Sequence, residues 1–315
     1  MPELTSWPLH SDDLSWAGTY FMRSDWTPEA TALRVRFGPI QYKYSMGGLG
    51  DVGDIGVWGH GMHLIPHIYM HPRTGPFREY GDRSFVGDGR SENTISVDGF
   101  GQSKHGRVRY ITEPLENPWL TTPVLDYVRG SYHFDPNEVD LNHTRAVLFV
   151  KPDYFVVIDR MTGEGEHDFR MKYQLHQDLQ ATADGTMVVG VSENGPGIVV
   201  APSRDDLELN IVIGQDEPKE GWHLFSETKA EPAPALIYTW REAVPAQVET
   251  VVCPIAPGEE ADLDLLRELD GDTVRLTVYR GEMRDVIVIG AGDDVTVMRY
   301  DADGELAATG ECGGR

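Results

Sequence analysis

Short runs of β-branched and aromatic residues, separated by Gly, Asp, Asn and Pro, recur along nearly the whole chain and constrain its fold more than any other feature. Clear examples are TALRVRFGP, DFRMKYQLHQD, ALIYTWREA and DTVRLTVYRG. Such runs are typical of strands, and the residues between them are typical of turns. Parallel strands need long crossover connections, which this sequence lacks. The pattern therefore predicts an all-β protein, a large antiparallel β-sandwich with supersandwich-like layers and few or no long helices.

Two segments allow more specific expectations. Residues 258–272, GEEADLDLLRELDGD, place leucines at helical spacing behind an acidic first turn, and we expect a short helix there. In AVLFVKPDYFVVIDRM, two alternating runs flank Lys151-Pro152-Asp153. Because Pro152 presets a turn and removes a donor that a central strand would need, this segment predicts a β-hairpin.

A change of composition near residues 244–246 suggests how the chain is divided. Residues 1–16 are predicted to be an N-terminal extension, 17–245 the main β-sandwich, 246–306 a C-terminal β section and 307–315 a flexible, glycine-rich tail. The strands of the C-terminal section could flank the main sandwich or complete its sheet. With 315 residues, 40% of them hydrophobic, the chain is long enough for a substantial core.

The charge balance is strongly acidic, with 27 Lys and Arg against 51 Asp and Glu and a formal net charge of −24. This charge repels phosphate backbones and anionic lipid, so we expect no nucleic acid and no membrane surface as partner. Between His71 and Tyr110, however, seven basic residues stand against five acidic ones. This arginine-rich segment is a local positive region that could face an anionic ligand.

Cysteine content and hydropathy bear on the compartment. Cys253 and Cys312 are too few for a disulfide framework; one bridge between them is an alternative to two buried thiols. The N-terminus lacks the basic start and apolar run of a signal peptide, and no segment approaches the roughly 20 apolar residues of a spanning helix. We therefore expect a soluble chain, cytoplasmic as given, or secreted or periplasmic if a signal was removed.

Several motifs occur in an informative order. GTYFMRSDW is followed by RVRFGP, a glycine-rich stretch, SENTISVDGFGQS, and HTRAVLFVKPDYFVVIDRMTGEGEHDFRMKYQLHQD. From about Gly18 to Pro257, this order resembles the C-terminal β-sandwich region of heparinase II/III-type polysaccharide lyases. The resemblance implies layered antiparallel sheets, normally preceded by a helical toroid, and β-elimination on uronic acids of a bound oligo- or polysaccharide. The toroid is not in this chain, so we expect a separate helical partner subunit or a homo-oligomer.

The resemblance also implies a zinc site, formed by one His of a His-x-His segment, a strand-end Asp and a His before Asn-Thr. In this sequence, Gly47 and Leu49 stand at the His-x-His positions, His67 at the strand-end Asp and Glu92 at the last His. Only the Asp that follows His-x-His keeps its type, as Asp51. His67 and Glu92 remain candidate metal ligands, but two ligands do not fill a tetrahedral shell, and zinc stays a possible cofactor.

The glycine-rich stretch precedes four histidines, His60, His63, His67 and His71. A four-residue spacing aligns side chains on a helix but separates them on a strand that contains Pro66. Structural imidazoles are therefore the alternative to a metal or catalytic site. The glycines would allow close backbone approach, either in a loop that faces a sugar or in a bulged strand.

Tyr80 lies where the relatives often carry a functional tyrosine, between Arg78 and Arg83. A nearby guanidinium lowers the pKa of a phenol and can bind a uronate carboxylate, as β-elimination requires. We expect Tyr80, with His67 or His105, to act as acid and base. The predicted substrate-binding residues are Arg78, Arg83, Arg90, Trp58 and Tyr69.

Two other functions stay open. A non-catalytic carbohydrate-binding module would use aromatic residues for sugar stacking, namely Trp58, Tyr69, Tyr80 and Trp119. A structural subunit would instead dock onto a helical protein through an exposed apolar face. Asn93 is expected to anchor a turn, and His176 is expected to be structural although relatives often have His there.

Overall fold

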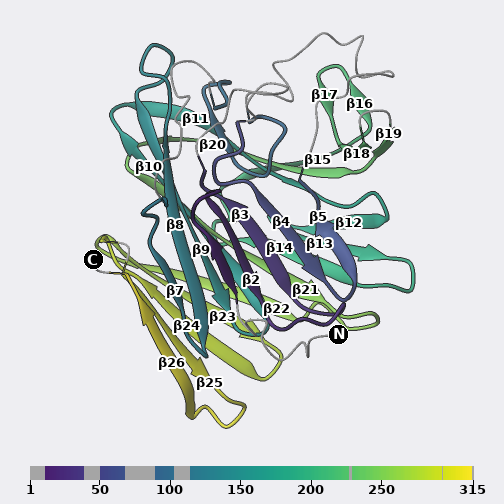
Figure 1. The fold of residues 1–315 in the computed structure, drawn as a ribbon, viewed down its shortest axis with the longest axis vertical. Helices are drawn as coiled ribbons and strands as arrows, with labels where there is room; N and C mark the ends of the chain where they lie inside the picture. The colour runs from purple at the N-terminus through teal and green to yellow at the C-terminus, as the bar shows by residue number, and fades with distance from the viewer. Residues whose placement is uncertain are drawn as a thin grey trace.

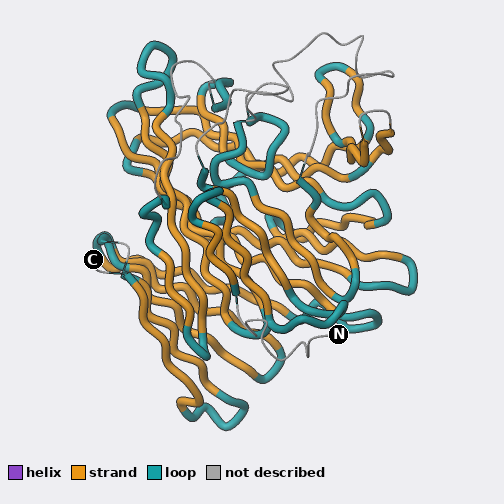
Figure 2. The backbone as a smooth tube through the Cα atoms, viewed as in Figure 1, coloured by secondary structure: helices purple, strands orange, loops and turns teal. Residues whose placement is uncertain are grey.

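The computed structural model describes residues 11–38, 50–67, 89–102, 114–226, 229–292 and 294–313. These residues contain no helix, and their strands form antiparallel sheets, as Figures 1 and 2 show. The predicted all-β fold is confirmed. The same residues include no helix long and apolar enough to cross a membrane.

The first sheet contains the N-terminal strands in simple order. These are β1 (Asp12–Leu14), β2 (Thr19–Arg23), β3 (Ala32–Arg36), β4 (Ile55–Gly59) and β5 (Met62–Ile65). Successive side chains of a strand point to opposite faces. In β3, Leu33 and Val35 are fully buried, whereas Arg34 and Arg36 lie on the other face and are only partly buried. We call this second face of the first sheet its polar face.

The largest sheet has eight strands, in the order β12-β13-β14-β21-β10-β9-β8-β7. Their bounds are β7 (Trp119–Thr121), β8 (Leu125–His133), β9 (Leu141–Val150), β10 (Tyr154–Gly163), β12 (Leu179–Asp184), β13 (Met187–Ser192), β14 (Gly197–Pro202) and β21 (Ala246–Ile255). The hairpin predicted around Pro152 is confirmed, because β9 and β10 pair from Val150 and Tyr154 outward.

A four-stranded sheet runs in the order β15-β20-β11-β6, and two small hairpins lie within the chain between β15 and β20. The strands of the sheet are β6 (Ile95–Val97), β11 (Glu166–Gln174), β15 (Glu208–Ile213) and β20 (Pro234–Ala243). The hairpins are β16 (Gln215–Asp216) with β17 (Lys219–Glu220), and β18 (Trp222–Ser226) with β19 (Lys229–Pro232).

The C-terminal sheet, yellow in Figure 1, is built from consecutive strands. These are β22 (Leu263–Asp270), β23 (Thr273–Arg280), β24 (Met283–Ile289), β25 (Val295–Tyr300) and β26 (Leu306–Cys312). It therefore begins at Leu263 rather than at residue 246, because residues 246–255 form β21 inside the eight-stranded sheet. Residues 307–312, expected in a flexible tail, pair with β25 instead.

The eight-stranded sheet is the middle layer of the molecule. In β9, Val147 and Phe149 belong to a core shared with the first and four-stranded sheets. The alternate residues Ala146, Leu148 and Val150 belong to a second core shared with the C-terminal sheet. A strand that is buried on both faces reads as one continuous apolar run, which explains the sequence AVLFV.

The short helix predicted for residues 258–272 is wrong. Residues 263–270 pair with β23 along their whole length. Leu263 is buried and Leu265 packs against the second core, whereas Leu266 and Leu269 are 47% and 64% exposed. Pairing with β23 and the burial of alternate leucines thus outweigh the local helical spacing.

The alternative of a disulfide bridge is also wrong. Cys253 and Cys312 are both free and buried in the second core. Burial raises the pKa of each thiol to about 12, so both are protonated and unreactive near neutral pH.

Candidate functional site

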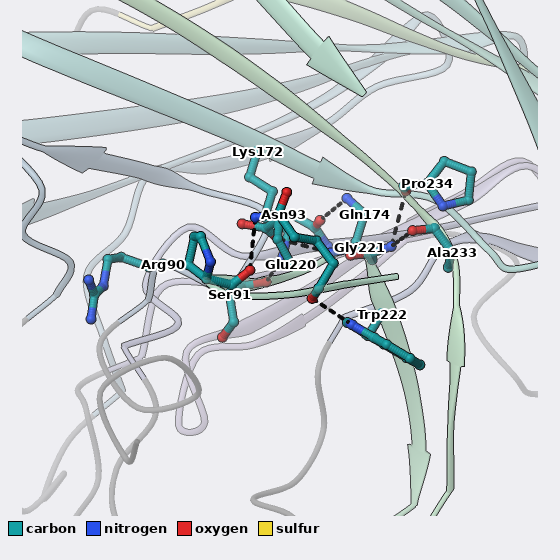
Figure 3. A network of polar contacts seen from close by, with 12 residues as sticks. Arg90, Ser91, Asn93, Lys172, Gln174, Glu220, Gly221, Trp222, Ala233 and Pro234 are labelled. Carbon is teal, nitrogen blue, oxygen red and sulfur yellow. Dashed lines mark hydrogen bonds and ion pairs between the residues drawn. The ribbon is translucent and has the colours of Figure 1, made fainter. Parts of the chain in front are cut away.

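Asn93 joins segments that are distant in the sequence. Its side-chain amide donates to the carbonyl oxygens of Ile55 and Pro66 at 2.8 and 3.0 Å. The side-chain oxygen Oδ1 of Asn93 accepts a hydrogen bond from the backbone N–H of Gln174 at 2.7 Å. The backbone N–H of Asn93 donates to the Asp54 carboxylate. Figure 3 shows Asn93 beside the polar residues at the end of β11. Asn93 therefore does more than anchor a turn.

Arg145 is buried beneath Asn93. Its guanidinium forms a two-point ion pair with Asp159, at 2.7 and 2.9 Å. It also donates to the backbone oxygens of Gly53 and Asn93, at 2.7 and 2.5 Å. Burial acts to raise the pKa of Asp159, but the Arg145 guanidinium and a hydrogen bond from His143 lower it to about 2. Arg145 thus fixes both the segment after Gly50 and the segment before β6.

A second buried cation holds the same segment from the other side. Lys172 donates to the carbonyl oxygen of Ser91 at 2.9 Å and pairs with Glu220 at 2.7 Å, as Figure 3 shows. Arg170 bonds the other oxygen of Glu220 and donates to the carbonyl of Arg90 at 3.1 Å. Burial acts to raise the pKa of Glu220, but these two cations keep it below its usual value. The backbone of Arg90, a predicted substrate-binding residue, is therefore held by Arg170, which is in turn paired with Glu220.

The polar face of the first sheet continues this charged region. Arg36 bonds Asp51, and Arg34 lies 3.7 Å from Asp54. Burial raises the pKa of Asp54 to about 6, even though Arg34 opposes the change. Burial also raises the pKa of Asp51 despite Arg36. Asp51, which follows the family's His-x-His positions and keeps its residue type, is therefore paired with an arginine.

Glu92 is the least satisfied group of the site. It is only 1% exposed, and neither carboxylate oxygen has a hydrogen-bond partner among the described residues. Burial and the nearby Asp54 and Asp51 raise its pKa well above the usual value, although Lys172 lies close enough to oppose this. A carboxyl in such surroundings is held in its neutral form.

These surroundings do not fit the zinc site implied by the family resemblance. Within the described ranges, no three His, Cys, Asp or Glu side chains are grouped closely enough to hold a metal ion. The predicted pair His67 and Glu92 therefore finds no third ligand there, and Asp51 is bound to Arg36.

Glu92→Gln is expected to stabilise the protein by about 1–3 kcal/mol at pH 8. The folded state holds a proton on Glu92 that the unfolded chain loses above a pKa near 4.5. The contribution of this bound proton to the free energy of unfolding is complete below pH 4.5 and is lost as the pH rises. A glutamine does not ionise, so its contribution does not fall with rising pH. Urea unfolding at pH 8 and pH 4.5 measures the difference. An equal effect at both pH values would contradict the assigned protonation.

Histidines gather beside Trp58 on the polar face. The imidazole of His63 stacks on the Trp58 ring with 4.0 Å between centres, and His67 lies 5.7 Å from His63. Gly56 makes room for this arrangement, because a Cβ there would lie 3.0 Å from both His67 and Trp58. One face of Trp58, a predicted sugar-stacking residue, is therefore occupied by His63.

A second imidazole pair comes from the end of β11 and from β18. His176 and His223 meet edge to face with 5.2 Å between centres, and His223 bonds Gln177 at 2.5 Å. His176, expected to be structural, thus contacts a hairpin that the sequence did not place near it. Burial lowers the pKa of His63 and His67 to about 3 and that of His223 to about 4.

The free energy of unfolding should depend on these imidazoles below pH 6.5. The unfolded chain takes up protons near 6.5, whereas folded His63 does so only near 3, so its contribution is lost as the pH falls through this window. Because Asp54 and Glu92 act in the opposite direction, the test compares the wild type with His63→Gln. Between pH 7 and pH 5, the free energy of unfolding of His63→Gln should fall by roughly 1–2 kcal/mol less than that of the wild type. Parallel pH profiles would contradict the lowered pKa.

Five predicted site residues lie outside the described residues, namely Tyr69, Arg78, Tyr80, Arg83 and His105. The described residues that flank them are placed close together. Asn93 bonds the carbonyl of Pro66, and a Cβ at Gly89 would lie 2.4 Å from the carbonyl oxygen of Gly50. Gln102 bonds the backbone of Val52 in both directions, at 2.8 and 2.6 Å.

Sequence reasoning missed the buried charges at the centre of the site. They are Arg145, Asp159, Lys172 and Glu220. A signal was available, because RAVLFV and RMKYQL place a cation inside runs that are otherwise core-forming. Charged residues are rarely buried without a partner, so such positions indicate an internal ion pair.

Residues 75–256 match the family described as Heparinase II/III-like, C-terminal. Over 176 residues the chain is 27% identical to a heparin-sulfate lyase of Pedobacter heparinus, and over 159 residues 23% identical to one of Bacteroides stercoris. These alignments cover 56% and 50% of this chain but only 25% and 22% of the lyases, so the chain spans about a quarter of their length.

Solved structures show the same fold. The heparan sulfate lyase HepC of Pedobacter heparinus superposes with a TM-score of 0.72 over 89% of this chain and 42% of its own, at 22% identity. A heparinase III gene product superposes at 0.68 over 93% of this chain and 42% of its own, at 17% identity. The family match covers more than half of the sequence and includes β6 to β21. The chain therefore belongs to the Heparinase II/III-like, C-terminal family.

Proposed function

We propose that this chain is the β-sandwich part of a polysaccharide lyase that cleaves uronic-acid-containing glycans by β-elimination. The observation that carries the proposal is the set of buried bonds around Asn93. The predicted Tyr80, Arg78 and Arg83 lie in the sequence between Pro66 and Gly89, and Asn93 ties the Pro66 end to the segment that follows Gly89. A segment held at both ends by buried bonds is a suitable carrier for catalytic groups.

The proposed roles follow from charge and proton affinity. Arg78, Arg83 and Arg90 would bind the uronate carboxylate, since a guanidinium matches a carboxylate with two hydrogen bonds. His67 is a weak base because burial lowers its pKa to about 3. Proton removal next to the carboxylate therefore falls to Tyr80 or His105, and His67 is left to donate or accept hydrogen bonds. Trp58 and Tyr69 would contact sugar rings.

The chain is to be incubated with heparan sulfate, chondroitin sulfate and alginate, alone and with the helical domain of a relative added. Formation of the unsaturated uronate is followed by ultraviolet absorbance. Product is expected from at least one polymer, and Tyr80→Phe should lower its rate about 100-fold or more. The absence of product from every polymer, with the helical domain supplied, would overturn the proposal.

A non-catalytic carbohydrate-binding protein is the second candidate. It is favoured by the changed metal positions, where Gly47 and Leu49 replace the His-x-His pair and the buried Glu92 replaces the last histidine. In this case the chain would retain acidic oligosaccharides without releasing an unsaturated product. A separate helical subunit or a second copy of the chain would be its partner in either function, which size-exclusion chromatography with light scattering can test.

A further inference from the structure

The outer face of the C-terminal sheet carries arginines and tyrosines on its central strands. In β23, Leu276 and Val278 point into the core shared with the eight-stranded sheet, so Arg275 and Tyr279 point outward. The neighbouring strands β24 and β25 continue this outer face. Its central residues are Arg275, Tyr279, Arg284, Val286, Met298 and Tyr300, which we call the Tyr-Arg face. In Figure 1 this sheet lies at the lower left of the molecule.

Three of these residues form a row across the strands. Tyr279 lies opposite Arg284, and Arg284 lies opposite Tyr300. The guanidinium carbon of Arg284 lies 4.3 Å from the centre of the Tyr300 ring, and Tyr279 is 40% exposed. Since adjacent strands are about 5 Å apart, the row spans roughly 10 Å of the surface. An aromatic, cationic and aromatic row of this length suits a short segment of a sugar chain.

Arg275 is exposed and Arg284 is partly exposed, and neither side chain is paired with a carboxylate of the described residues. Neither the Arg275 nor the Arg284 side chain has a hydrogen bond or ion pair with another described residue, and Arg284 Nε is buried against its neighbours. Arg267, Arg280 and Arg299 of the same sheet, by contrast, each pair with a carboxylate. This difference is notable because the chain has a net charge of −24 and carboxylates are plentiful.

Acidic residues on this face are confined to the two edge strands. Asp264, Glu268 and Asp270 lie on β22 and Glu311 on β26, while the outward positions of β23, β24 and β25 have none. Glu268 is opposite Arg275 in the register but forms no ion pair with it. The centre of the face is therefore positive and aromatic, with its acids at the margins. This charge pattern fits an anionic ligand laid across the three central strands.

We propose that the Tyr-Arg face is a second binding surface for an anionic polysaccharide, separate from the site around Asn93. Carboxylate or sulfate groups would bind Arg275 and Arg284, and sugar rings would pack on Tyr279 and Tyr300. The inference rests on the proposed function for its class of ligand. The surface lies in residues 263–312, beyond the region of the family match.

The test measures binding of the full chain to three immobilised polymers: heparin, alginate and neutral dextran. Heparin presents sulfate and alginate presents carboxylate alone, so the pair identifies the anionic group. The variants are Arg275→Gln with Arg284→Gln, Tyr300→Ala and Tyr300→Phe. Arg241→Gln is the control for loss of an exposed arginine elsewhere on the surface, because Arg241 lies on β20 and pairs with Glu166 and Asp168. Thermal unfolding verifies that every variant is folded.

The double arginine variant should bind the acidic polymers about tenfold more weakly and elute at lower salt. Tyr300→Ala should weaken binding severalfold, and Tyr300→Phe and Arg241→Gln should not. Unchanged binding by the folded double variant would overturn the inference. So would a wild-type dimer that this variant dissociates, since a second copy would then be the occupant. Failure of the proposed function is distinguishable, because it removes the unsaturated product without changing binding to this face.

Discussion

Replacing Arg145 with Met is expected to lower the free energy of unfolding by about 3–5 kcal/mol. The substitution leaves the Asp159 carboxylate without its two-point partner in a site where it is fully buried. It also removes the donors to the backbone oxygens of Gly53 and Asn93. Denaturant unfolding followed by tryptophan fluorescence measures the change.

Two further variants separate the buried charge from lost packing. Arg145→Met combined with Asp159→Leu removes both charges, and it should recover a large part of the loss. Arg241→Met, at a position whose side chain is 57% exposed, should cost less than about 1 kcal/mol. A loss in Arg145→Met no greater than in Arg241→Met would show that the buried ion pair is not essential to the fold.

Asn93→Ala is expected to cost about 2–4 kcal/mol, the second largest effect. Its side chain satisfies the carbonyls of Ile55 and Pro66 and the N–H of Gln174, and all three would remain buried without it. Asn93→Asp should lower the free energy of unfolding at least as much, because a carboxylate cannot donate to the two carbonyls. Unfolding measurements give the stability of both variants.

The matched control is Asn117→Ala. Asn117 makes one side-chain hydrogen bond, to the Tyr20 hydroxyl at 3.2 Å, and it is partly exposed. Its loss should cost about 1 kcal/mol or less. If Asn93→Ala and Asn117→Ala were equally stable, the central role given to Asn93 would be wrong. Under the proposed function, Asn93→Ala should also slow formation of the unsaturated product, because Pro66 and the segment after Gly89 lose their connection.

Much of the fold could be predicted because a strand buried on one or both faces has a recognisable sequence. The hairpin around Pro152 combines two apolar runs with a proline turn, and both signals are local. Residues 263–270 show the limit of this approach. Their leucines satisfy a helical spacing equally well, and only the neighbouring β23 selects the strand.

The candidate site was less predictable because its bonds join residues far apart in the chain. Arg145 contacts Gly53, 92 residues away, and Lys172 contacts Ser91, 81 residues away. Family resemblance drew attention to Glu92 as a metal ligand and to Asn93 as a turn residue, whereas the structure shows that Asn93 joins three distant segments. It could not show that Asp51 is bound to Arg36 or that Glu92 lacks a hydrogen-bond partner among the described residues.

The position of the eight-stranded sheet between two cores has a practical consequence for shortened versions of the protein. The match to the family ends at residue 256, so a shortened protein could be designed to end there. A chain cut there would leave Leu148, Val156 and Val251 in water, on the side that the C-terminal sheet covers. A hydrophobic surface of this extent favours aggregation. A shortened protein that keeps this surface covered therefore extends through Cys312, past the end of the family match.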